Sequence, residues 1–240
     1  MCHGDDSRPP SASGAGSAAA TGDLTLTSAD GTSVLAFEAR AGEPTGAGIV
    51  VLPDVRGLHQ FYKDLAVRFA EVGVDAVAID YFGRTATTPD RTDAFEFMPH
   101  VQQTTPEGVA ADVAAAVAQL RSDGATRVFT VGFCFGGGYS WRQSADTPGL
   151  AGCIGFYGRP QPALEVADRM QAPLVMLVAG ADAHIPVEDT RAVKEAASVE
   201  ADFVVFEGAP HSLFDRTAGE HAAAAEQAWT RIRRFVLEHA

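Results

Sequence analysis

The 240-residue sequence has few cysteines, few basic residues and no long apolar segment. Its three cysteines form no close CxxC pair and lack a zinc-type histidine spacing, which argues against a disulfide framework and a structural zinc site. Lys and Arg number 18 against 31 Asp and Glu, so the net charge of −13 disfavours nucleic acid and anionic membranes as partners. No apolar run of about 18 residues or more occurs, and therefore no membrane-spanning helix is predicted.

The start of the chain is poor in apolar residues. Residues 1–22 are rich in Ser, Ala and Gly, contain Pro9 and Pro10, and lack the basic start and apolar core of a secretory signal. Such a composition predicts a disordered tail over 1–22, followed by one domain over 23–240. With no disulfide framework, we expect a cytoplasmic protein in a reducing compartment, where a reactive thiol persists.

Beyond the tail, short apolar runs alternate with amphipathic segments. This alternation is typical of an α/β fold with a mostly parallel, doubly wound sheet and helices on both faces. With 46% hydrophobic residues, a chain of this length can bury a large core in one domain. The expected elements are a hairpin (24–27 with 34–37), strands near 49–52, 75–79, 127–131, 150–156, 174–179 and 203–206, helices near 61–72, 106–123 and 220–239, and a polar excursion over 85–103.

A cysteine stands at the centre of the segment Gly132–Gly136, which reads GxCxG. In GxSxG hydrolases the equivalent residue is a serine on a sharp turn between a strand and a helix. The strand-like segment Arg127–Val131 precedes the motif, and glycines lead from it into a helix-like segment. Cys134 is therefore a candidate nucleophile, and the alternative is an inert cysteine buried in a glycine-rich turn.

Two further segments supply the groups that a thiol nucleophile needs, a base and an acid that orients it. Asp182 follows the apolar run 174–179, and His211 follows the apolar run 203–206. Nucleophile, acid and histidine thus occur in the chain order of α/β-hydrolases. His184, two residues after Asp182, is interpreted as a loop residue beside the site rather than as the base.

The predicted turn also explains how the thiol would react. A cysteine at a helix N-terminus has its thiolate favoured by main-chain N–H groups and by the helix dipole. The N–H of Phe135 and that of Val55 are the expected oxyanion donors, and each such donor is typically worth about 3 kcal/mol in the transition state.

The sequence resembles the dienelactone hydrolase family, the cysteine-dependent branch of the α/β-hydrolases, over about residues 30–238. The resemblance rests on the segments GFCFGG, GADAHIP, APHSLFDR and VVLPDVRGL. It implies that Cys134 is the nucleophile, His211 the general base and Asp182 the orienting acid. It also implies that two arginines, Arg84 and Arg216, hold a carboxylate of the substrate. The alternative for Arg84 is a solvated loop charge.

By the same resemblance, Asp54 corresponds to a carboxylate that contacts the resting thiol. A carboxylate beside a thiol disfavours the thiolate by like-charge repulsion, so we expect Asp54 to gate Cys134 until the substrate rearranges it. The alternative is that Asp54 pairs with Arg56 or Arg84.

Together these features predict a hydrolase that cleaves an ester or lactone through an acyl-thioester on Cys134. The resemblance implies a small-molecule substrate of the carboxymethylenebutenolidase type, an unsaturated lactone that bears a carboxylate, and no metal or organic cofactor. The alternatives are a non-catalytic binding protein on a hydrolase scaffold and a general carboxylesterase or thioesterase. A redox-sensing thiol protein is disfavoured because Cys153, expected in a buried strand, cannot act as a resolving cysteine.

Overall fold

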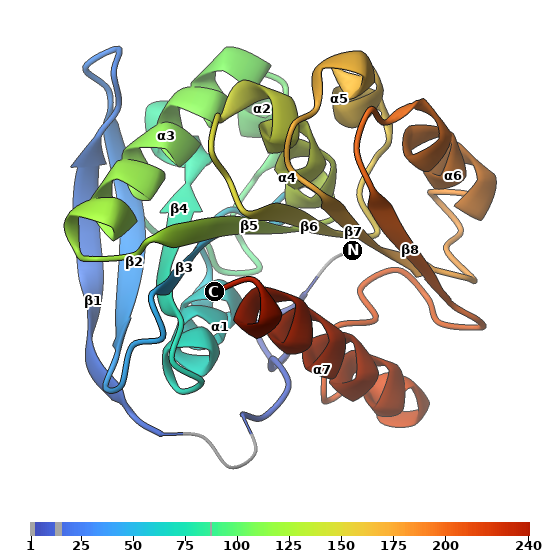
Figure 1. Cartoon of the computed structure of the whole chain (residues 1–240), viewed down its shortest axis with the longest axis horizontal. Coiled ribbons are helices and arrows are strands. Elements are labelled where there is room, and N and C mark those ends of the chain that lie inside the picture. Colours follow the sequence, from blue (N-terminus) through green and yellow to red (C-terminus); the bar gives the residue numbers. More distant parts are fainter. Residues whose placement is uncertain (1–2, 13–15, 87) are drawn as a thin grey trace.

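A sheet of eight strands runs through the middle of the protein, in a computed structural model that describes residues 3–12, 16–86 and 88–240 (Figure 1). The strand order is β1-β2-β4-β3-β5-β6-β7-β8. The first two strands pair antiparallel and β2 also runs antiparallel to β4, whereas the pairs from β4 to β8 are parallel. The strands are β1 (Ala18–Thr27), β2 (Ser33–Ala41), β3 (Ala47–Leu52), β4 (Asp75–Asp80), β5 (Arg127–Phe133), β6 (Gly152–Phe156), β7 (Leu174–Ala179) and β8 (Ala201–Phe206).

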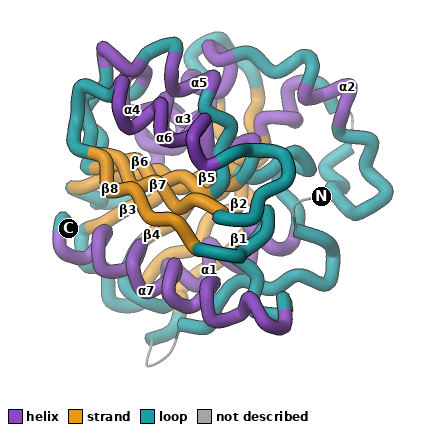
Figure 2. The backbone as a smooth tube through the Cα atoms, turned by 90° about the vertical axis from the view of Figure 1, so that its right-hand side faces the viewer, coloured by secondary structure: helices purple, strands orange, loops and turns teal. Residues whose placement is uncertain are grey.

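Helices cover both faces of this sheet (Figures 1 and 2). Two of them, α1 and α7, lie on one face, and α3, α4, α5 and α6 lie on the other. The helices are α1 (Gln60–Ala70), α2 (Met98–Val101), α3 (Pro106–Ser122), α4 (Phe135–Asp146), α5 (Gln161–Leu164), α6 (Val187–Ala196) and α7 (Ala222–Glu238). The predicted doubly wound α/β architecture is confirmed.

The apolar character of the central strands explains their position. All six residues of β3 and all six of β7 are buried, as expected for parallel strands that are covered on both faces. On one face Phe69 and Trp229 pack into the core between the sheet and α1 and α7, while Trp141 belongs to the core on the other face.

Local signals in the sequence set the ends of α3. Thr105 caps the helix, since its hydroxyl accepts the N–H of Gly108 at 3.1 Å, and Pro106 occupies the first turn. At the other end Gly124 adopts a φ of +107°, which ends the helix. The predicted hairpin is also observed as β1 and β2, while the excursion over 85–103 contains the short helix α2. Within the described residues no helix is long and apolar enough to cross a membrane.

The strand register brings the loops of the candidate site to one edge of the sheet. Leu52 of β3 pairs with Gly132 of β5, and Phe133 of β5 pairs with Phe156 of β6. The residues that follow these strands, among them Asp54 and Cys134, therefore emerge side by side at the carboxyl ends of parallel strands, where α/β folds hold their ligands.

The N-terminal segment differs from the sequence expectation of a disordered tail over 1–22. Residues 1–2 and 13–15 lie outside the described residues. Within the expected tail, however, β1 begins at Ala18, which pairs with Ala41 of β2. His3 is only 1% exposed. The composition of the segment indicates disorder because few of its residues are apolar, whereas its placement depends on contacts with loops that are distant in the sequence.

Candidate active site

Cys134 lies at a sharp turn between β5 and α4. Its backbone has φ 53° and ψ −110°, and residues other than glycine rarely adopt such a positive φ. Cys134 is also the N-cap residue of α4. Such strain costs about 1–3 kcal/mol and persists only where the surroundings enforce it. The N–H of Cys134 donates to the carbonyl of Phe156 at 3.0 Å, which ties the turn to the end of β6.

The glycines of this turn are required by space. A Cβ on Gly132 would lie 2.0 Å from the carbonyl oxygen of Gly136, and a Cβ on Gly136 would lie 2.3 Å from that of Leu52. Both neighbours are backbone atoms, which cannot move aside without disturbing α4 or β3. The GxCxG pattern therefore lets the first turn of α4 pack directly against the end of β3.

A histidine and a carboxylate from two other loops meet beside this turn. Nδ1 of His211 lies 2.6 Å from Oδ2 of Asp182. The second oxygen of Asp182 accepts the main-chain N–H groups of His184 at 2.8 Å and Ile185 at 3.2 Å. Because the Asp182 side chain is 1% exposed and its two oxygens have fixed donors, it holds the imidazole ring in one orientation.

The environment of His211 favours its protonated form. Burial lowers the pKa of this imidazole, but hydrogen bonding and attraction to Cys134 and to Asp182 outweigh that effect and raise the pKa above its ordinary value. Cys134 is thus a hydrogen-bond partner of His211, and it remains partly exposed. The structure brings together the three residues that the sequence nominates as nucleophile, base and acid.

Two main-chain amides nominated as oxyanion donors, those of Val55 and Phe135, belong to the segments that meet here. Val55 follows β3, and Phe135 is the first residue of α4. Neither N–H has a protein acceptor among residues 3–12, 16–86 and 88–240. Both groups are therefore available to a bound molecule.

Asp54 does not contact the thiol in the way the sequence predicts. Its buried carboxylate accepts the N–H of Arg56 at 2.9 Å and the N–H of His3 at 3.2 Å, and Nε2 of His59 lies 3.7 Å away. Burial raises the pKa of Asp54, but the attraction of His59 and His3 and the N–H of Arg56 bring it below its ordinary value. The contact with the thiol is not observed among the described residues, and the gating role of Asp54 stays a prediction. The alternative ion pair is not observed there either, since Arg56 contacts Asp54 through its backbone and Arg84 pairs with Asp30 and Asp112.

Arg84 has protein carboxylates as partners. Its guanidinium lies 2.6 Å from Asp112, which is fully buried on α3, and 2.6 Å from Asp30 in the β1–β2 turn. The hydrogen bonds with Asp112 and Asp30 raise the pKa of Arg84 above its ordinary value, although burial alone would lower it. The buried Asp112 needs this cation, so the structure gives Arg84 a structural partner, while its role in holding a substrate carboxylate stays a prediction.

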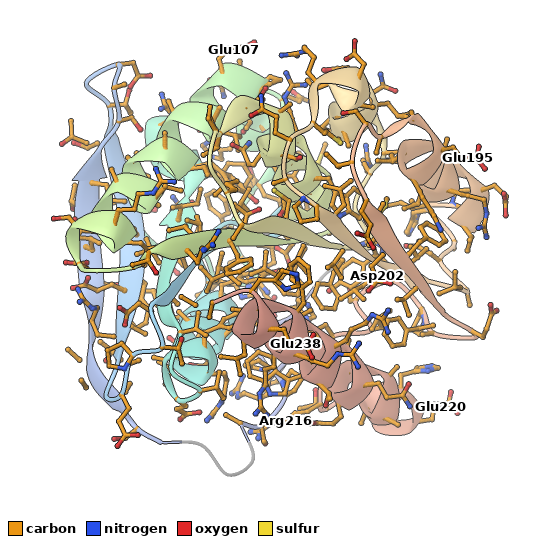
Figure 3. All side chains as sticks on the ribbon, viewed as in Figure 1. Glu107, Glu195, Asp202, Arg216, Glu220 and Glu238 are labelled. Atoms are coloured by element: carbon orange, nitrogen blue, oxygen red, sulfur yellow. The ribbon has the colours of Figure 1, made fainter. Side chains whose placement is uncertain are left out.

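Arg216 is bound to the N-terminal segment. Its N–H donates to the carbonyl of Arg8 at 3.0 Å, and its Nη1 donates to the hydroxyl of Ser11 at 2.9 Å. Figure 3 shows Arg216 on the side of the sheet that α1 and α7 cover. Arg216 therefore contacts Arg8 and Ser11 in this structure, and its contact with a substrate stays a prediction.

Sequence reasoning missed two residues at this edge, Tyr157 and His3. Tyr157 is buried, has a φ of 35°, and its ring centroid lies 4.7 Å from that of His211. It follows β6, so the rule that sites form at the carboxyl ends of parallel strands could have found it. His3 carries no such signal, because it lies in a segment whose composition predicts disorder.

The packing of the turn predicts that Gly136→Ala destabilises the protein by about 3 kcal/mol, since the added methyl overlaps backbone that cannot relax. Gly22→Ala is the matched control: nothing lies within 4 Å of its Cβ, and we expect a change within about 0.5 kcal/mol. Urea unfolding measures both. Equal stability of the two variants would contradict the described packing.

We also predict that Arg84→Ala lowers the free energy of unfolding by about 3 kcal/mol, because it leaves the buried Asp112 without its cation. Arg127→Ala, at the exposed start of β5, serves as a control and should change stability by less than about 0.5 kcal/mol. Chemical denaturation followed by circular dichroism distinguishes them. A neutral effect of Arg84→Ala would show that the ion pair is not structural.

Comparisons with known proteins identify the family and agree with the fold. The model of the dienelactone hydrolase family matches residues 37–240. A protein of Methylorubrum extorquens assigned as a carboxymethylenebutenolidase is 30% identical over 208 residues, which cover 80% of this chain and 72% of the relative. A Bradyrhizobium protein assigned as a 2-oxo-3-(5-oxofuran-2-ylidene)propanoate lactonase is 27% identical over 232 residues, covering 88% of this chain and 91% of the relative.

A solved structure has the same architecture. The crystal structure of a protein from Klebsiella pneumoniae subsp. pneumoniae, assigned as a dienelactone hydrolase, superposes with a TM-score of 0.78 at 27% identity, covering 90% of this chain and 98% of the other. The family model spans far more than half of the chain. The chain therefore has the α/β-hydrolase fold and belongs to the dienelactone hydrolase family, as a hydrolase of carboxylic esters.

Proposed function

We propose that the protein hydrolyses ester or lactone bonds through a triad of Cys134, His211 and Asp182 and an acyl-thioester intermediate. One observation carries this proposal: His211 is hydrogen-bonded to both Cys134 and Asp182. Cys134 itself lies on the strained turn at the N-terminus of α4. A thiolate on Cys134 would pair with an imidazolium on His211, since the contacts with Cys134 and Asp182 raise the pKa of His211.

In the first half of the reaction, Sγ of Cys134 attacks the carbonyl carbon and forms a tetrahedral oxyanion. The N–H groups of Val55 and Phe135 stabilise this oxyanion. As the ring C–O bond breaks, the imidazolium of His211 protonates the leaving oxygen, and the acyl group stays on sulfur as a thioester.

In the second half, neutral His211 takes a proton from water as the water oxygen attacks the thioester carbonyl. The C–S bond then breaks, and the sulfur leaves as a thiolate beside the imidazolium that His211 has become. A lactone yields one ring-opened hydroxy or enol acid for each water consumed. Every group in these steps belongs to the chain, the substrate or water.

The relatives support a substrate class. The substrate names of the Methylorubrum and Bradyrhizobium relatives both describe an unsaturated five-membered lactone with a side chain that ends in a carboxylate. For this chain we propose the same chemical class, a carboxylated unsaturated lactone such as a dienelactone. A general carboxylesterase or thioesterase, which would not require the carboxylate, is the second candidate and is favoured by the other partners that Arg84 and Arg216 have.

A different arginine is available for the substrate carboxylate. Arg159 is exposed, and no hydrogen bond or ion pair of its side chain occurs within the described residues. Its carbonyl oxygen would lie 2.2 Å from a Cβ on Gly138, which belongs to the first turn of α4, directly after Cys134. Because its backbone lies beside this turn and its exposed side chain is long, we propose Arg159 as the residue that binds the substrate carboxylate.

Three substitutions test the triad. With a dienelactone and with a chromogenic short-chain ester, Cys134→Ala and His211→Ala should each reduce kcat by about a thousandfold or more, because the triad acts as a unit. Asp182→Asn should also reduce kcat, and it should lower the pKa of His211, since it removes a charge that raises that pKa. Equal weak rates in all variants and the wild type would instead indicate a non-catalytic binding protein.

The carboxylate is tested by comparing kcat/KM for a carboxylated lactone with that for its neutral methyl ester. We expect Arg159→Ala to reduce the preference for the carboxylated substrate by about tenfold or more, mainly through KM, because a charge-assisted hydrogen bond is lost. Arg127→Ala, at the opposite end of β5, should leave the preference unchanged. A wild type without any preference would favour the general esterase.

A further inference from the structure

The first described residues cross the edge of the sheet where the candidate site lies. We call residues 3–11 the N-terminal strap. Near its outer end the N–H of Arg8 donates to Asp215 at 3.1 Å, and the carbonyl of Arg8 accepts the N–H of Arg216. Both partners belong to the segment after β8 that also carries His211. The strap is therefore tied to the active-site loop rather than to a remote surface.

The inner end of the strap is a buried histidine. The ring of His3 stacks on Phe61 at a centroid distance of 3.8 Å, and its Nε2 forms a hydrogen bond of 2.9 Å with the hydroxyl of Tyr157. Its main-chain N–H donates to Asp54. Burial is the main cause that lowers the pKa of His3 to about 4, so the ring is neutral near pH 7. One residue thus connects Asp54 with the tyrosine that packs against His211.

A buried arginine fastens this end. Arg56, 6% exposed, donates to the carbonyl of His3 at 2.5 Å and pairs with Asp5 of the strap. The same guanidinium lies 2.8 Å from Asp93, and it donates to the carbonyl of Arg91 at 3.0 Å. The inner end of the strap is therefore joined to the loop after β3 and to the 85–103 excursion.

The strap covers Asp54 but leaves the nucleophile accessible. Asp54 is 0% exposed, whereas Cys134 is only partly buried with the strap in place. A segment whose role was to block the site would be expected to bury the sulfur. The burial of Asp54 and the partial exposure of Cys134 instead indicate that the strap holds the carboxylate of Asp54 in place.

Asp54 emerges close to Cys134. Both residues lie two positions beyond a paired position of neighbouring parallel strands, Leu52 of β3 and Gly132 of β5. The first turn of α4 also packs against the carbonyls of Leu52 and Pro53. Asp54 and Cys134 therefore emerge side by side, and a negative charge adjacent to a thiol raises the pKa of that thiol.

We propose that His3 is a positioning residue, which holds Asp54 away from Cys134 so that the thiol and His211 are paired before substrate binds. This inference rests on the nucleophilic role of Cys134 in the proposed function. The charged and titratable groups around Asp54 and Cys134 are His3, Asp5, Arg56, His59, Asp182, His211 and Asp215.

The experiment measures alkylation of Cys134 by iodoacetamide as a function of pH, with the labelled peptide identified by mass spectrometry so that the other cysteines do not contribute. In His3→Ala we expect the midpoint of the profile to rise by about one pH unit, which slows labelling about tenfold below the midpoint. Removal of residues 1–11 should have the same effect. Asp6→Ala is the control, because Asp6 is an exposed strap residue, and its midpoint should not change.

A second substitution distinguishes positioning from a merely structural role. If His3 acts through the Asp54 charge, the double variant His3→Ala/Asp54→Asn should return the midpoint to that of Asp54→Asn alone. A shift that persists in the double variant would overturn the proposal, and so would an unchanged midpoint in His3→Ala. Faster labelling at an unchanged midpoint after removal of residues 1–11 would also overturn it, since the strap would then be a plug.

The labelling assay contains no substrate, so its outcome is separable from that of the hydrolysis assays. A shifted midpoint that Asp54→Asn suppresses supports the positioning role even where the lactone is not hydrolysed. Thermal unfolding of His3→Ala, which should remain cooperative, verifies that the shift is measured on folded protein.

Discussion

The close contact between the first turn of α4 and the end of β3 is the constraint on which the site depends. Gly136 has no room for a side chain against Leu52, and this packing holds Cys134 in a left-handed backbone conformation at the helix N-terminus. The sulfur then lies where main-chain N–H groups favour a thiolate. A larger residue in the turn would displace the helix from the sheet, and the sulfur, the Phe135 amide and the loop after β3 would no longer meet.

The protein fixes its buried carboxylates with different partners. Asp182 is held by His211 and two main-chain amides, Asp54 by amides and His59, and Asp112 by Arg84. Only the first of these carboxylates acts directly on the imidazole. In a chain with a net charge of −13, such pairing limits the repulsion that an anionic substrate and a thiolate would otherwise meet.

The sequence predicts the fold and the nucleophile, acid and base positions because these depend on local patterns. Alternating apolar runs define the strands, and each of the three candidate residues lies in the turn or loop that follows one of them. The pairing of Arg84 with Asp112 could not be predicted, because Asp112 is an ordinary helix residue until the fold buries it. His3 was missed for the same reason: its contacts with Asp54 and Tyr157 join positions far apart in the chain, and composition does not record them.

The central claim is that Cys134 carries the acyl group during turnover. Rapid acid quenching of the enzyme with a slowly hydrolysed ester, followed by mass spectrometry of the digested protein, tests it directly. The account predicts an acyl adduct on the peptide that contains Cys134, formed in a burst equal to the enzyme concentration and absent from His211→Ala on the same timescale. Turnover without any adduct on that peptide, or an adduct on another residue, would contradict it.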